Sequence, residues 1–180
     1  MQAIEEKLIE SFKLVTRFFR DNNIRYCLIG GMAAGFWGNP RYTQDMDFTV
    51  MSRSRKIKEI IDLFQANGFK IIEKGVSQFS IVEKGNLSFR SDLILSETDY
   101  QDLVVMRAME ITLFETPTSI CTPEDLIILK MIANRRQDLV DIETTLKKSS
   151  QRLDKEYLKK WLKIWEVLES FKKEFKEFPL

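Results

Sequence analysis

The sequence contains no histidine, and this absence excludes several classes of catalytic site. Serine–histidine and cysteine–histidine nucleophiles, histidine general bases and imidazole metal sites all need a residue that the chain does not have. Any chemistry must therefore use carboxylates, lysine, tyrosine, arginine or a bound metal. Because the remaining metal ligands are oxygens, the expected metal is a hard cation, magnesium or manganese, or else calcium.

Cysteine is scarce, and long apolar runs are absent. Cys27 and Cys121 lie far apart and fit no zinc-binding spacing, which favours buried free thiols. No apolar run approaches the roughly 20 residues that span a bilayer, and charged residues interrupt the N-terminus too early for a signal segment. We therefore expect no membrane partner and a reducing, cytoplasmic location.

A strong net charge is also lacking. The chain has 28 lysines and arginines against 27 aspartates and glutamates, a net charge of +1, so any cationic surface must be local. Its 180 residues, 44% hydrophobic and 31% charged, suffice for one globular core. No repeat or low-complexity linker divides the chain, so we expect a single domain over residues 1–180.

Hydrophobic spacing predicts a mixture of helices and strands. Helices are expected over about 3–21, 54–67, 99–108, 126–134 (after a start at Thr122-Pro123), 137–148 and from Asp154 onward. Strands are expected over 26–29, 45–50, 69–73, 78–83, 87–95 and 110–114. The three runs 69–73, 78–83 and 87–95 are expected to form an antiparallel meander. These elements indicate an α+β fold, a small mixed sheet flanked by helices, with a core of about 25–145 and a helical C-terminal extension of about 150–180.

Two aspartates separated by one residue are the first chemical signal. On a strand, the spacing of Asp45 and Asp47 puts both carboxylates on one face, and Met46 and Phe48 then face the core. Like charges placed side by side indicate a cation between them. Solvated acids on an exposed strand edge explain the pair alone equally well.

A third carboxylate, Asp92, lies in an otherwise apolar run. A buried aspartate without a partner costs several kcal/mol, so Asp92 should face a cation or a site, or else pair with Arg90 on the same face. Three acids from two adjacent strands can bind one or two divalent ions. Two such ions about 4 Å apart can clamp the attacking and leaving oxygens of phosphoryl or nucleotidyl transfer.

A glycine pair, Gly30-Gly31, directly follows the first strand. Glycine lets the backbone approach a ligand closely, and a helix that follows offers free N–H groups to a phosphate. The pair belongs to neither a P-loop nor a G-x-G-x-x-G motif, so an ordinary tight turn is the alternative interpretation.

These motifs together resemble the nucleotidyltransferase superfamily that includes DNA polymerase beta. The shared pattern is Gly30-Gly31, thirteen residues, Asp45-x-Asp47, and a later strand with Asp92. The resemblance implies a nucleotidyltransferase fold, magnesium bound by the three aspartates, and nucleotide phosphates held at the glycines. Many members have serine at the second glycine, so one hydroxyl contact to phosphate is missing here.

More narrowly, GGMAAGFWGNPRYTQDMDF and CTPEDLIILKMIANRRQDLVDI are similar to the bacterial AbiEii-type toxin nucleotidyltransferases and their small relatives. In those toxins the second segment faces the nucleotide, which favours a phosphate contact for Lys130. Pairing with Asp138 or Asp141 is the alternative. Arg41, in the loop before Asp45, either reaches the triphosphate or is a solvated loop residue.

The expected function is magnesium-dependent transfer of a nucleoside monophosphate from an NTP to an acceptor, with Asp92 also a candidate base. The resemblance implies a toxin with an antitoxin partner, and RNA, a protein side chain or a small molecule are open as acceptors. One alternative is a catalytically silent protein of the same fold that binds a nucleotide or partner. Another is an aminoglycoside-type antibiotic nucleotidyltransferase, for which Glu97, Asp99 and Asp102 are candidates for an acidic acceptor pocket.

Overall fold

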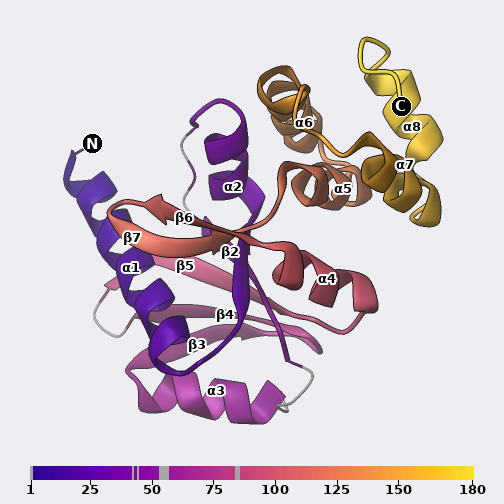
Figure 1. Ribbon diagram of the computed structural model, residues 1–180. Helices are drawn as coiled ribbons and strands as arrows, with labels where there is room; N and C mark the ends of the chain where they lie inside the picture. The colour runs from indigo at the N-terminus through magenta and orange to yellow at the C-terminus, as the bar shows by residue number, and fades with distance from the viewer. Residues whose placement is uncertain (1, 42, 44, 53–56, 84–85) are drawn as a thin grey trace.

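The computed structural model describes residues 2–41, 43, 45–52, 57–83 and 86–180. In chain order the elements are α1 (Gln2–Asp21), β1 (Tyr26–Ile29), α2 (Gly30–Trp37), β2 (Asp45–Val50), α3 (Ile57–Ala66), β3 (Phe69–Lys74), β4 (Gln78–Glu83), β5 (Asn86–Leu95), α4 (Asp99–Arg107), β6 (Met109–Leu113), β7 (Thr116–Ile120), α5 (Pro123–Ala133), α6 (Arg136–Ser149), α7 (Lys155–Ile164) and α8 (Leu168–Glu174). The predicted mixture of helices and strands is confirmed (Figure 1).

The strands form one mixed sheet in the order β3-β4-β5-β2-β1-β7-β6. The predicted meander of β3, β4 and β5 is antiparallel, as expected, whereas β2 runs parallel to β5 and β1 runs parallel to β7. Strand β7 was not predicted. Its sequence, TPTSI, contains a proline and has threonines at its inward positions, so it lacks the apolar alternation that reveals a strand.

Helices α1 and α3 cover one face of the sheet with aromatic side chains. The ring of Phe12 on α1 stacks on Phe48 of β2 at 6.4 Å, and Phe64 on α3 contacts Phe69 and Phe79 edge to face. These side chains are almost fully buried. The amphipathic spacing of α1 and α3 therefore forms the main core, as the sequence predicts.

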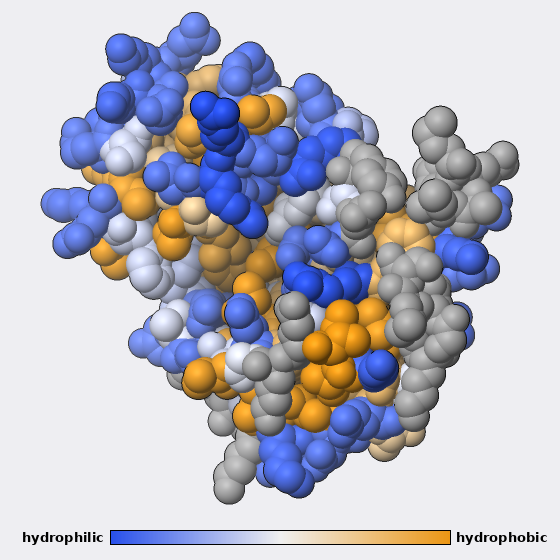
Figure 2. All heavy atoms as spheres, turned by 180° about the vertical axis from the view of Figure 1, so that it is seen from behind, coloured by the Kyte–Doolittle hydropathy of each residue, from blue (hydrophilic) through white to orange (hydrophobic). Residues whose placement is uncertain are grey.

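The opposite side carries α2 and the C-terminal helices, which lie above the sheet in Figure 1, while α3 lies below it. Helix α2 packs on α5 and α6, α5 packs on α7, and α7 contacts α8. Seen from behind, this helical part presents mostly hydrophilic surface, whereas hydrophobic surface is concentrated in the lower half (Figure 2). None of the described helices is long and apolar enough to cross a membrane.

The single helix expected from Asp154 onward is two helices in the structure. Helix α7 ends because Glu166 adopts a left-handed conformation with φ of 57°. The Val167 N–H then donates to the Leu162 carbonyl and the Glu166 N–H to the Lys163 carbonyl. This pair of hydrogen bonds most often ends a helix at a glycine. Because a glutamate occupies the position here, the sequence does not indicate that the helix ends.

A buried carboxylate, Asp125, joins the start of α5 to α4 and α7. It has no exposed side-chain surface and accepts hydrogen bonds from Tyr157 (2.6 Å), Tyr100 (3.2 Å) and Arg107 (3.2 Å), among others. The Arg107 guanidinium also lies 3.8 Å from the centre of the Tyr157 ring. Burial and the neighbouring Asp125 carboxylate raise the pKa of Tyr157, so its hydroxyl stays protonated as a donor.

Replacing Tyr157 with phenylalanine is expected to lower the free energy of unfolding by about 1.5–3 kcal/mol, because a hydrogen bond to a buried charge is lost. The ring remains to pack under Arg107, so the loss isolates the hydroxyl. Chemical denaturation measures it, and an unchanged unfolding midpoint would contradict the role given to this bond.

Candidate active site

Parallel pairing of β2 and β5 brings two predicted acids side by side. The register aligns Asp47 with Asp92 and Asp45 with Arg90, so these four side chains share one face. Met46 and Phe48, between and beyond the two acids of β2, are fully buried in the core. The expected facing of this strand is confirmed.

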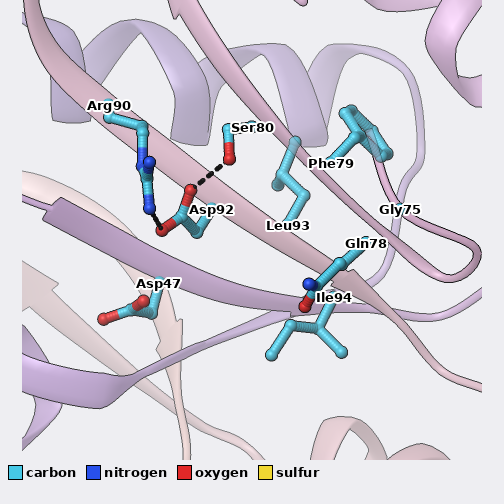
Figure 3. A pocket seen from close by; sticks show the side chains of 9 residues that line it. All are labelled: Asp47, Gly75, Gln78, Phe79, Ser80, Arg90, Asp92, Leu93 and Ile94. Carbon is cyan, nitrogen blue, oxygen red and sulfur yellow. Dashed lines mark hydrogen bonds and ion pairs between the residues drawn. The ribbon is translucent and has the colours of Figure 1, made fainter. Parts of the chain in front are cut away.

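Asp92 is held by two neighbours on the sheet (Figure 3). The Ser80 hydroxyl of β4 donates to one carboxylate oxygen at 2.6 Å, and the Arg90 guanidinium donates to the other at 2.8 Å. The pairing with Arg90 was the local alternative considered for this acid. Ser80 was not predicted as a site residue. The antiparallel register of β4 and β5, which aligns Ser80 with Asp92, is the signal that would have indicated it.

Asp47 is a partly buried carboxylate with a raised pKa. Burial raises its pKa, and the negative charges of Asp92 and Asp45 raise it further. The opposing influences are the Gly31 N–H, 3.5 Å from a carboxylate oxygen, and the positive charge of Lys130. A partly buried carboxylate that is repelled in this way favours a bound cation.

The glycine turn lies directly against Asp47. Gly30 has φ of +66°, and a Cβ atom built on it would lie 2.0 Å from an Asp47 carboxylate oxygen. At Gly31 a Cβ would lie 3.0 Å from the Arg41 guanidinium and from the Thr43 hydroxyl. Helix α2 begins at Gly30 itself, and the N–H of Gly31 in its first turn points toward the Asp47 carboxylate.

The two predicted phosphate contacts, Arg41 and Lys130, are both paired with Asp141. The Lys130 ammonium is buried and lies 2.7 Å from Asp141 and 2.9 Å from Asp138, and Arg41 forms two 3.0 Å bonds to Asp141. Burial alone would raise the pKa of Asp141, but hydrogen bonds from Arg41 and Lys130 outweigh it and lower the pKa. The structure thus shows the pairing that was the alternative for Lys130.

A pocket of about 460 Å³ opens beside Asp47 and Asp92 on the exposed face of the sheet. Its lining residues are Asp47, Gly75, Gln78, Phe79, Ser80, Arg90, Asp92, Leu93 and Ile94 (Figure 3). The three candidates for an acidic acceptor pocket, Glu97, Asp99 and Asp102, do not line it.

The donor set fits a divalent cation in its chemistry. Asp45, Asp47 and Asp92 could offer carboxylate oxygens as ligands, and burial together with the negative charges of Asp92 and Asp45 raises the pKa of Asp47. Within the described residues no three acidic or cysteine side chains form a complete metal-binding cluster. Asp92 faces Ser80 and Arg90 instead, so a metal would compete with Arg90 for it.

Solved structures with the same fold include several nucleotidyltransferases. The aminoglycoside enzyme ANT(2″)-Ia, in complex with adenylyl-2″-tobramycin, matches with a TM-score of 0.60 and 13% identity over 89% of this chain and 97% of that one. An antigenic nucleotidyltransferase-like protein from Paracoccidioides brasiliensis matches with a TM-score of 0.57 and 16% identity over 95% and 93%. The lincosamide adenylyltransferase LnuA, bound to lincomycin, matches with a TM-score of 0.55 and 12% identity over 76% and 94%.

At these identities the similarity shows the nucleotidyltransferase fold, and no curated protein matches the sequence. The family comparison goes further, because residues 6–177 match the family described as "Nucleotidyltransferase of unknown function (DUF6036)". The match spans nearly the whole chain and includes every candidate site residue. The chain therefore belongs to this nucleotidyltransferase family.

Proposed function

We propose that the protein transfers a nucleoside monophosphate from an NTP to a hydroxyl group of an acceptor, with magnesium or manganese held by Asp45, Asp47 and Asp92. The observation that carries the proposal is the contact between the Gly30-Gly31 turn and Asp47, which brings backbone N–H groups and a carboxylate to one point. When bound, the metal would supply positive charge that stabilises the negative charge developing on the phosphates during transfer.

The protein's own groups have separate tasks in this reaction. Gly30 and Gly31 let the triphosphate approach the start of α2, where N–H groups bind it. The acceptor oxygen forms a bond to the α-phosphorus while the bond to pyrophosphate breaks, and Asp92 accepts the hydroxyl proton. Arg41 and Lys130 bind the departing pyrophosphate, which competes with Asp141 for both cations. Asp92, oriented by Ser80, faces the acceptor and is the candidate base.

Transfer of label from α-³²P-labelled NTPs tests this function. Wild-type protein with magnesium is expected to label one of three acceptor classes: RNA, protein, or a small molecule such as an aminoglycoside or a sugar phosphate. Asp62→Asn, a change at an exposed acid on α3 that pairs with Lys58, should keep full activity. Binding of NTP and magnesium without transfer to any acceptor would favour a silent nucleotide- or partner-binding protein.

We also propose, from the resemblance to AbiEii-type toxins, that the protein acts in the cytoplasm as a toxin restrained by an antitoxin protein. Induced synthesis without a partner is then expected to slow bacterial growth, and Asp47→Asn should relieve the effect. Normal growth together with resistance to an aminoglycoside would instead identify an antibiotic nucleotidyltransferase, the second candidate. This candidate is suggested by the similar fold of ANT(2″)-Ia.

A further inference from the structure

The order of the strands separates the two sides of the candidate site. The glycine turn follows β1, which flanks β2 on one side, while β5 and β4 flank β2 on the other. The 460 Å³ pocket lies on the β5–β4 side, with Asp47 and Asp92 at its border. In an in-line displacement the acceptor and the leaving pyrophosphate are on opposite sides of the transferred group. If the triphosphate lies at the glycine turn, the pocket receives the acceptor.

The charged side chains that line this pocket are two acids and one cation. Beyond Asp47 and Asp92 its described lining contains no acid, and its one cation is Arg90. The Arg90 side chain is 37% exposed, so part of it faces the pocket while it also donates to Asp92. Gln78 and Ser80 add an amide and a hydroxyl. A divalent cation bound to Asp47 and Asp92 would balance their negative charge, and Arg90 would then be the remaining charged side chain of the described lining.

We infer that the acceptor carries a phosphate group close to its reacting hydroxyl, and that Arg90 binds this phosphate. The inference rests on the proposed function and specifies its acceptor. A guanidinium matches the geometry of a phosphate and binds it through charge-assisted hydrogen bonds. The ammonium groups of an aminoglycoside would meet Arg90 with like charge. A phosphorylated small molecule and the phosphate-linked end of an RNA share the required chemistry.

Equilibrium binding of matched ligands tests the role of Arg90. Ribose 5-phosphate and ribose differ only by the phosphate, and both are titrated with magnesium, with and without an α,β-methylene NTP. We expect the phosphorylated sugar to bind at least about tenfold more tightly, the effect of one hydrogen bond to a charged group. Arg90→Ala should abolish this ratio and Arg90→Lys should keep part of it. Lys70→Ala, at an exposed cation on β3, should leave it unchanged.

The ratio separates phosphate binding from an effect of Arg90 on Asp92, because a misplaced Asp92 would weaken both sugars equally. A ratio near one in the wild type, a ratio unchanged in Arg90→Ala, or tighter binding of tobramycin than of ribose 5-phosphate would each overturn the inference. A short RNA with a free 3′-hydroxyl distinguishes the source, since it should bind more tightly than the sugar if the acceptor is nucleic acid. Binding of the methylene NTP is measured separately, and its absence would count against the proposed function.

Discussion

Gly30→Ala is expected to lower the free energy of unfolding by about 2–4 kcal/mol and to reduce nucleotidyl transfer about a hundredfold. Two costs add at this position. The backbone φ of +66° is unfavourable for any residue with a side chain, and the new Cβ would lie 2.0 Å from an Asp47 carboxylate oxygen. Asp47 must move to remove the overlap, and that movement displaces the carboxylate from the glycine turn.

Gly68→Ala is the matched control. Gly68 has φ of +88°, but a Cβ there would meet nothing within 4 Å. We expect this variant to lose only the backbone share, about 1–2 kcal/mol, and to keep full transfer activity. Denaturant unfolding and the labelled-NTP assay measure both variants. Equal losses in the two would show that the overlap with Asp47 has no effect.

Asp47→Asn is expected to reduce transfer roughly a thousandfold while making the metal-free protein more stable. In the proposed mechanism the activity falls because the divalent cation, which contributes several kcal/mol to phosphoryl transfer, would lose a charged ligand. The stability rises because the change removes a partly buried negative charge that Asp92 and Asp45 repel. Loss of both activity and stability would contradict this account, as would full activity.

The stability gain should depend on pH in a defined direction. The pKa of Asp47 is raised in the folded protein, chiefly by burial. Stability linked to its protonated form is fully present below the ordinary pKa of an aspartate and is lost as the pH rises through the raised pKa. The advantage of Asp47→Asn should therefore be largest at neutral pH and shrink on acidification. Unfolding in the presence of a chelator measures it, and Asp62→Asn is expected to show no such dependence.

Short sequence patterns predicted the features that depend on neighbouring residues alone. The two-residue spacing in β2 was enough to place Asp45 and Asp47 on the exposed face, and Thr122-Pro123 was enough to start α5. For Lys130 the sequence left two alternatives, a phosphate contact or pairing with an aspartate of α6. The choice depends on how α5 and α6 pack, which the local sequence does not reveal. The roles of these residues in binding metal and nucleotide stay predictions.

Other features could not be predicted because their cause lies outside the local sequence. Strand β7 forms because β1 and β6 pair with it, in spite of Pro117. Ser80 becomes a partner of Asp92 only through the β4–β5 register. The end of α7 depends on a left-handed glutamate, Glu166, where sequence rules look for glycine. In each case a long-range or unusual backbone contact decides the structure.

The crossover between the parallel strands β2 and β5 has a consequence for how new specificities arise. It contains α3 and the β3–β4 hairpin, and β3 is an edge strand. Gly75 and Gln78, which line the pocket, belong to this hairpin, whereas Asp47 and Asp92 lie on the strands that the crossover connects. Substitutions or insertions in residues 69–79 would therefore reshape the pocket while the aspartates keep their register, so divergence in acceptor choice can proceed without loss of the chemistry.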